Sequence, residues 1–297
     1  MEFFFIFVTS LLLAALNQLH VITQWLHNPP DRMFTGIAHS FADYFLYTDL
    51  LAQGASEGMW TAAHFTNEPM GRTWIYWFNA LLGWLGNVMG ISPFTTYNVS
   101  LFLLVIALCL LWYQVTKALY PTNRFLRLTS WLMILSASSF WANGELLGQF
   151  WFSPTPAFNR LGGVPHQVVQ TTFFILLTIC FSHRRIGRSA SWRMVGLGIL
   201  AALAASANPI QMVLFVGAAG ITTLVALHRT GLFHGVLPLV ILIGTALPVM
   251  IATNKAFDLP VLAAAKVWEN AQAVSVSLWQ FFLSVGPIAL LVPFGIR

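Results

Sequence analysis

Long apolar stretches recur along the whole chain, and the charged residues fall almost entirely between them. Only 8% of the residues are charged, whereas soluble domains carry about 25%. The many phenylalanine and tryptophan residues, 25 and 12, are typical of side chains at a membrane–water interface. The composition therefore predicts an all-α polytopic membrane protein. Its net charge of +5 comes from basic residues in a few loops, and we expect no nucleic-acid partner.

About eight of the apolar stretches are long enough to be considered as transmembrane helices. The first, Glu2–Ile22, has neither a basic segment before it nor a cleavage site after it, so we expect it to be retained. The others follow a long polar region, and they are Thr96–Lys117, Leu128–Asn143, Gln167–Phe181, Met194–Ala207, Ile210–Leu227, Phe233–Thr253 and Val276–Phe294. They predict a single transmembrane domain over residues 1–297, with a first outer loop over residues 23–95.

The segment Trp74–Ile91 decides which loops face which side of the membrane. It is apolar enough to span, but it contains Asn79, Asn87 and three glycines. If it lies in the interface, nine of the 14 basic residues fall in short loops on one side, as the positive-inside rule requires. Eight of the nine acidic residues then fall on the other side. We therefore predict an interfacial helix, a cytoplasmic N-terminus and an acid-rich outer face. A true span, with the N-terminus outside, is the alternative.

The segment Ala42–Asp49 begins the polar part of this outer face. Asp43 and Tyr47 are four residues apart and would share one face of a helix, whereas Asp49 would lie elsewhere on it. A carboxylate beside a membrane can act as a general base or bind a hard divalent cation. The alternative is that both acids are solvated loop residues.

Two further outer segments carry side chains suited to phosphate. His64, Glu68 and Arg72 fall within nine residues, and Arg160 and His166 flank a pair of glycines. Arginine holds phosphate through paired hydrogen bonds, and an imidazole can bind phosphate or transfer a proton. The alternatives are an internal pair between Glu68 and Arg72 and a simple turn with a capping histidine.

Other sequence patterns exclude several classes of site. The chain contains no Walker loop, no GxSxG, no HExxH and no paired-cysteine motif, and its two cysteines, Cys109 and Cys180, lie in apolar runs. The middles of those runs contain no Asp, Glu, Lys or Arg. Ion-coupled transporters usually keep ionisable groups at that depth, so the pattern argues against one.

The order of these features resembles that of the membrane glycosyltransferases of the GT-C fold. That group includes protein O-mannosyltransferases, oligosaccharyltransferases and aminoarabinose transferases. The resemblance rests on a first helix followed by the acid of Ala42-Asp43-Tyr44-Phe45-Leu46-Tyr47. The segments Gly58-Met59-Trp60 and Phe65-Thr66-Asn67-Glu68-Pro69 then lead to an interfacial helix. The resemblance covers residues 1–130. Beyond residue 130 it rests only on the number of helices. Because family members usually continue beyond this length, we expect a compact member or a truncated chain.

The resemblance implies transfer of a sugar from a polyprenyl-phosphate donor to an acceptor on the non-cytoplasmic side, in a membrane such as the bacterial inner membrane. Asp43 would then be the catalytic base, supported by Asp49 or Glu68. The remaining candidates would bind the substrate or its phosphate: Tyr47, His64, Arg72, Arg160 and His166. A divalent metal, Mg²⁺ or Mn²⁺, bound by Asp43 stays open, because Tyr44 stands where a second acid would complete a pair.

Two other classes of protein fit the same sequence. A multi-helix transporter or lipid flippase would need a polar path open to the inside. A structural subunit of a larger membrane complex would use the outer loops as a docking surface.

Overall fold

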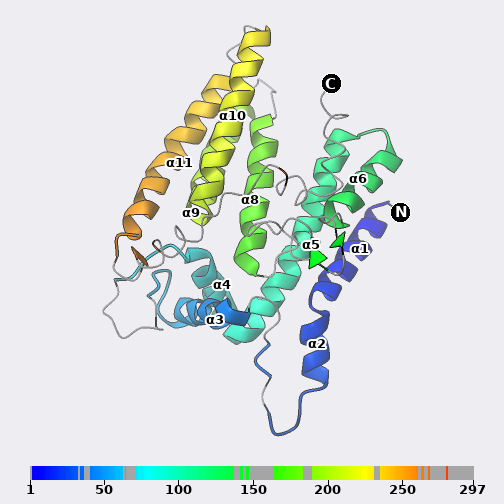
Figure 1. Ribbon diagram of the computed structural model, residues 1–297, viewed down its shortest axis with the longest axis vertical. Coiled ribbons are helices and arrows are strands. Elements are labelled where there is room, and N and C mark those ends of the chain that lie inside the picture. Colours follow the sequence, from blue (N-terminus) through cyan, green and yellow to red (C-terminus); the bar gives the residue numbers. More distant parts are fainter. Residues whose placement is uncertain are drawn as a thin grey trace. The chain divides into compact units, whose positions relative to one another are not determined.

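The computed structural model describes residues 2–32, 34–36, 41–62, 64, 71–136, 141–142, 145–146, 164–182, 189–230, 235–259, 262–263, 267 and 279. Helices dominate this part of the chain (Figure 1). The only strands in it, β1 (Trp141–Ala142) and β2 (Glu145–Leu146), form one antiparallel pair. The predicted helical class is therefore confirmed.

The helices are α1 (Glu2–Asn17), α2 (Leu19–Leu26), α3 (Phe41–Ser56), α4 (Trp77–Val88), α5 (Pro93–Leu119), α6 (Arg124–Ser136), α8 (Pro165–Ser182), α9 (Ser189–Ala207), α10 (Pro209–Thr230) and α11 (Val236–Ala256). They belong to two compact units. Unit 1 comprises residues 1–48, 91–168 and 269–297, and unit 2 comprises residues 49–90 and 169–268. Helices α3 and α8 contribute residues to both units.

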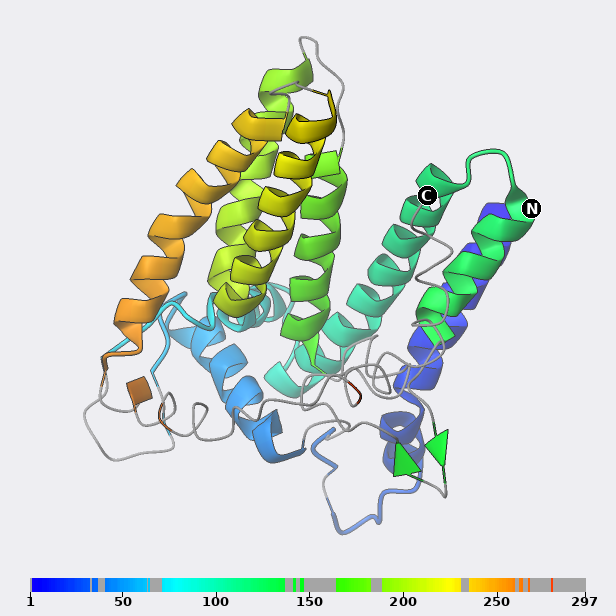
Figure 2. The same ribbon diagram turned by 45° about the horizontal axis from the view of Figure 1, so that its top comes forward.

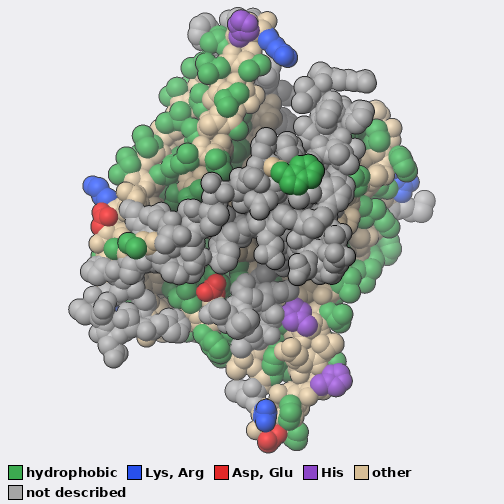
Figure 3. Space-filling model, viewed as in Figure 1, with side chains coloured by type: hydrophobic (Ala, Val, Ile, Leu, Met, Phe, Trp, Pro, Cys, Tyr) green, Lys and Arg blue, Asp and Glu red, His purple; other side chains and the backbone are tan. Residues whose placement is uncertain are grey.

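Three described helices, α5, α10 and α11, are long and apolar enough to cross a membrane. Helices α1 and α2, which meet at a bend of 54°, would make a fourth span if they cross together. Hydrophobic side chains cover most of the described surface in view in Figure 3. These features indicate an integral membrane protein, but the described residues do not support eight spans. Within the expected span Leu128–Asn143, the described helix α6 ends at Ser136. The expected span Val276–Phe294 lies almost wholly outside the described residues.

Helix ends follow local signals in the sequence. At the start of α5, the side chain of Ser92 accepts a hydrogen bond from the backbone N–H of Thr95, and Pro93 occupies the first turn. At the start of α10, Oδ1 of Asn208 accepts from the N–H of Gln211 at 3.0 Å, and Pro209 follows it. The tight turn predicted at Asn208-Pro209 is thereby confirmed.

In unit 1, α1 packs along α5. The buried residues of α1, which are Ile6, Ser10, Ala14 and Asn17, recur every three or four positions and so form one stripe. Glu2, at the start of α1, accepts a hydrogen bond from the hydroxyl of Tyr113, near the end of α5. The N-terminus also lies beside the connection from α5 to α6 (Figure 2). Helices α1 and α5 are therefore antiparallel.

This arrangement bears on the segment Trp74–Ile91. The chain leaves α1 and enters α5 at the same end of unit 1. Residues 18–92 therefore begin and end on the same side of a membrane that α1 and α5 cross. Helix α4 has 12 residues, which gives it a length of about 18 Å, against a hydrocarbon core of about 30 Å. Both findings agree with the prediction that the segment does not span, whereas its place in the interface stays a prediction.

In unit 2, α9, α10 and α11 pack around a buried core rich in small residues: Leu197, Ala201, Ala204, Ala205, Met212, Leu242 and Ala246. Small side chains let membrane helices approach closely. The amide of Gln170 in α8 donates to the carbonyl of Ala207 at 2.8 Å and accepts from Asn208 at 3.3 Å. These contacts fix α8 at Gln170 against the turn between α9 and α10.

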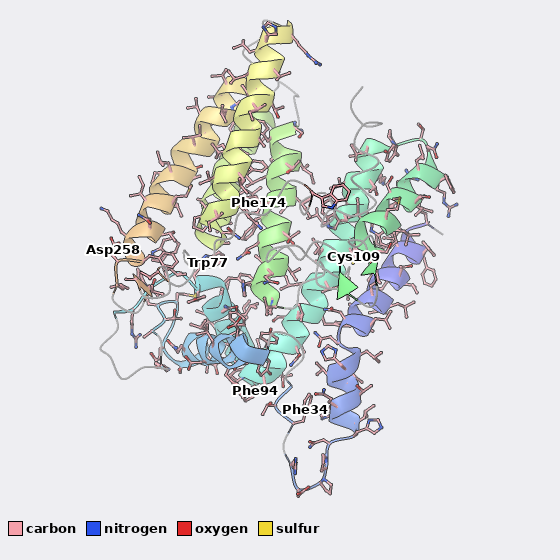
Figure 4. All side chains as sticks on the ribbon, viewed as in Figure 1. Phe34, Trp77, Phe94, Cys109, Phe174 and Asp258 are labelled. Carbon is pink, nitrogen blue, oxygen red and sulfur yellow. The ribbon has the colours of Figure 1, made fainter. Side chains whose placement is uncertain are left out.

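The part of α3 that belongs to unit 2 lies directly on α4. A methyl group at Gly54 would lie 2.0 Å from the carbonyl oxygen of Ala80, and one at Gly83 would lie 1.8 Å from that of Leu51. The two backbones are therefore in contact at these glycines. The indole N–H of Trp77, labelled in Figure 4, donates to the hydroxyl of Ser206 at 3.0 Å and so ties α4 to the end of α9.

Candidate functional site

The candidate residues fall in two groups, one in each unit. Unit 1 holds Asp43, Tyr47 and His166, and unit 2 holds Asp49, His64 and Arg72. Glu68 and Arg160 lie outside the described residues.

Asp43 is exposed in the first turn of α3. The next residue, Tyr44, is fully buried, and its hydroxyl donates to the carbonyl of Thr35 at 2.6 Å. Its ring meets Tyr97 edge-on, with centroids 5.0 Å apart, and stacks on Phe94 at 6.3 Å. Burial raises the pKa of Tyr44 to about 12, against a smaller opposing effect of the Asn98 amide. Tyr44 is thus a neutral anchor that holds the start of α3 on α5.

Gly36, which precedes α3 in the chain, is also held against α5. The Asn98 amide donates to the carbonyls of Gly36 and Phe94, at 3.2 and 3.0 Å. Gly36 has a φ of +76°, and a methyl group there would lie 2.8 Å from the Asn98 nitrogen. Glycine is therefore the residue that this position accommodates without strain.

The ring of Tyr47 contacts that of His166 near the start of α8, with centroids 4.7 Å apart. Burial lowers the pKa of His166 to about 4, so its imidazole is neutral at pH 7. No group in the described part of the chain hydrogen bonds to its Nδ1. As a neutral imidazole, His166 lacks the positive charge that a phosphate contact would favour.

In unit 2, Asp49 forms a pair with His64. The Nδ1 of His64 lies 3.1 Å from Oδ1 of Asp49. The side chain of Asp49 is 22% exposed, whereas that of His64 is 48% exposed. The imidazole is thus held at one nitrogen and accessible on its remaining surface.

Gln53 fixes this pair in place. Its amide nitrogen donates to Oδ2 of Asp49 at 2.7 Å and to the carbonyl of Ala62 at 2.8 Å. Its carbonyl oxygen accepts from the backbone N–H of Ala62, also at 2.8 Å. Thr61 and Thr73 exchange two backbone hydrogen bonds, at 2.9 and 2.8 Å, which close the loop that carries His64. Gln53, Thr61 and Thr73 are all buried.

Arg72 lies at the end of the same loop. Its Nη2 donates to Oε2 of Glu57 at 2.5 Å, and both side chains are substantially exposed. An exposed pair of this kind contributes little to stability. Arg72 is therefore accessible to a ligand, with part of its charge offset by Glu57.

Two adjoining shallow apolar depressions form an open groove between α9 and α11 in unit 2. Their volumes are about 610 and 510 Å³, and Ile199, Ala202 and Pro248 line both. The second also contacts Trp74, the residue that follows Thr73. The groove therefore runs along the helices to the foot of the loop that carries His64.

A metal site at Asp43 would need further ligands. Within the described ranges, no three His, Cys, Asp or Glu side chains lie close enough together to hold a metal ion. The metal at Asp43 stays a prediction, and no step proposed below passes through one.

Gln53 and Glu57 belong to the site but were not among the residues predicted from the sequence. Gln53 stands four residues after Asp49, a spacing at which side chains on a helix meet, so the pair was detectable once α3 was expected. Nothing in the sequence indicates that Glu57 meets Arg72, because the two are joined through a loop closure.

The helices define the class of the protein as an integral membrane protein. Comparisons with protein-family models, with curated proteins and with solved structures found no match.

Proposed function

We propose that the protein is a membrane-embedded glycosyltransferase that moves a sugar from a polyprenyl-phosphate donor to an acceptor on the non-cytoplasmic side. The antiparallel packing of α1 and α5 carries this proposal. Residues 18–92 begin and end at one end of unit 1, and α3 in that segment presents the exposed Asp43. A first helix, an acid-bearing outer segment and a return helix are the order that the GT-C resemblance implies.

Charge supports the proposed orientation. Lys117, Arg124 and Arg127 lie at the end of unit 1 that holds the N-terminus, opposite the start of α5. Basic residues in short loops favour the cytoplasmic side. The segment with Asp43 would then face outward, as in an enzyme of the bacterial inner membrane that uses a lipid-linked donor.

The groove between α9 and α11 supports a lipid-linked donor. It is lined almost wholly by apolar side chains and belongs to helices of which α11 is long enough to span. A single long hydrocarbon chain suits such a groove better than a compact ligand does. The proposed donor is therefore an isoprenoid lipid phosphate that enters from the bilayer.

In the proposed reaction, the Asp43 carboxylate takes the proton of the acceptor hydroxyl. The acceptor oxygen forms a bond to the anomeric carbon, and the bond from that carbon to the phosphate oxygen breaks. The electron pair of that bond leaves with the lipid phosphate. Arg160 is the cationic candidate for the phosphate in this reaction.

The experiment is turnover in liposomes. Wild-type protein, Asp43→Asn and the control Asp31→Asn are supplied with polyprenyl-phosphate sugars, and the released lipid phosphate is measured. Loss of a general base predicts that Asp43→Asn falls by about 100-fold or more, while Asp31→Asn keeps its rate. Wild-type turnover in Asp43→Asn would remove Asp43 from the mechanism. Movement of labelled lipid between leaflets without release of lipid phosphate would instead favour the flippase.

A further inference from the structure

We propose that Lys117 and Arg124, which lie on either side of the turn from α5 to α6, bind the phosphate of an anionic phospholipid headgroup. The site lies wholly within unit 1 and does not depend on the proposed function. Its ligand is a lipid of the leaflet at the end of unit 1 that holds this turn.

The first argument is depth in the membrane. Helix α5 has 27 residues, which gives it a length of about 40 Å. A bilayer measures about 40–45 Å with its headgroups included, so an α5 that crosses it has its last turn at the level of the headgroups. Lys117 lies in that turn, and Arg124 is the first residue of α6. Both cations are therefore at the depth of the lipid phosphates.

The second argument is that both cations are available. The carboxylate of Glu2 is already occupied, because Arg127 donates to both of its oxygens, at 2.7 and 2.9 Å, and the hydroxyl of Tyr113 donates to Oε1 at 2.7 Å. Nε of Arg124 is left 3.7 Å from Oε2, beyond hydrogen-bonding distance, and the side chain is 59% exposed. Lys117 is exposed and makes no hydrogen bond or ion pair with the part of the chain that the structure describes.

The third argument is the surroundings of the cations. Large apolar side chains at the same turn are exposed, Leu119 at 65% and Phe125 at 75%. A free anion in water would make no use of them, whereas a phospholipid presents its phosphate to the cations and its acyl chains to the apolar side chains. Charge also matches an anionic lipid, because Glu2, the carboxylate that contacts this turn, is already neutralised by Arg127.

The fourth argument is that the turn is fixed. Nη1 of Arg127 donates to the carbonyl of Pro121 at 3.1 Å. The N–H of Leu126 donates to Oδ1 of Asn123 at 3.0 Å. Less conformational entropy is then lost when a headgroup binds. Within such a site, the arginine can form two parallel hydrogen bonds to phosphate oxygens, and the lysine adds a point charge.

The test uses the full-length protein in nanodiscs of phosphatidylcholine that contain a rising fraction of phosphatidylglycerol with a photoreactive acyl chain. After illumination, the yield of the cross-linked peptide that contains Phe125 is measured against that fraction. The variants are Lys117→Gln, Arg124→Gln and the double variant. The matched control is Arg32→Gln with Lys255→Gln, which removes an exposed arginine and an exposed lysine elsewhere in the chain.

A basic residue at a membrane surface raises the affinity for an anionic lipid by about fivefold. Each single variant should therefore need about five times as much phosphatidylglycerol for half-maximal labelling, and the double variant about 25 times as much. The control should match wild type. Phosphatidylcholine with the same photoreactive chain should label wild type and the double variant alike.

Half-maximal labelling of the double variant within about twofold of wild type overturns the inference. An equal loss in the control also overturns it, since net charge alone would then explain the effect. Displacement of the lipid by inorganic phosphate at constant ionic strength would overturn it in favour of a site for the free anion. If the double variant does not fold, the single variants decide, because each changes one exposed side chain and leaves the pair of Glu2 with Arg127 intact. None of these outcomes depends on turnover, so they leave the proposed function untouched.

Discussion

Arg127 donates from Nε and Nη2 to the two carboxylate oxygens of Glu2, at 2.7 and 2.9 Å, although 125 residues separate them. The Arg127 side chain is 10% exposed, and its Nη1 also donates to the carbonyl of Pro121. The pair thus joins the first residues of α1 to the start of α6.

Removing one partner of this pair should destabilise unit 1. Glu2→Gln leaves a nearly buried guanidinium without its counter-ion, so the free energy of unfolding should fall. Thermal unfolding in detergent measures it. In the double variant Glu2→Gln with Arg127→Gln, part of the loss should be recovered. Strictly additive losses would show that the two side chains do not interact.

The contact between α3 and α4 yields a second prediction. Gly83→Ala places a methyl group 1.8 Å from the carbonyl oxygen of Leu51, so the helices must separate, at a cost of about 2 kcal/mol or more. Gly217→Ala is the matched control, because nothing lies within 4 Å of a methyl group at that position of α10. The control should be neutral or more stable by up to about 1 kcal/mol. Equal unfolding temperatures for the two variants would rule out the close backbone contact.

Much of the fold was predictable because its signals are local. Apolar runs predict the helices α5, α10 and α11 within a few residues of their ends. The pair Asn208-Pro209 predicts the turn between α9 and α10. The side chain of Asn208 caps the start of α10, and the ring of Pro209 prevents α9 from continuing. The break between α1 and α2 was missed, since Gln18 stands there and neither proline nor glycine marks it.

The candidate site was predictable only in part. Asp49 and His64 were singled out for their chemistry, but their contact depends on Gln53 and on the backbone pairing of Thr61 with Thr73. A single sequence does not indicate that two loop residues twelve positions apart, here Thr61 and Thr73, form backbone hydrogen bonds with each other. The same limit applies to Glu2 and Arg127, whose contact exists because α1 and α5 are antiparallel.

A third prediction follows from the antiparallel arrangement of α1 and α5, and it concerns which residues are accessible from each side of the membrane. A cysteine at Asp31, after α2, and one at Asn123, between α5 and α6, should face opposite sides of the membrane. An impermeant maleimide added to intact cells should label Asp31→Cys and should label Asn123→Cys only after lysis. Labelling of both without lysis would contradict the arrangement, and the reversed pattern would invert the proposed orientation.

The fourth prediction concerns His166 and pH. Burial lowers its pKa from 6.5 to about 4, so the unfolded chain binds this proton more readily than the folded one. Stability from this group is therefore complete above about pH 6.5 and is lost as the pH falls toward about 4, by about 3 kcal/mol in all.

The measurement compares unfolding of wild type and His166→Gln in detergent at a series of pH values. Both chains share every other titrating group, so the difference between their free energies of unfolding isolates His166. That difference should move in favour of His166→Gln as the pH falls, because glutamine does not take up a proton. A difference that is constant from about pH 7 to about pH 4 would mean that His166 titrates as it does in water. The imidazole beside Tyr47 would then be solvated and free to act as a cation, which returns it to the group of phosphate-binding candidates.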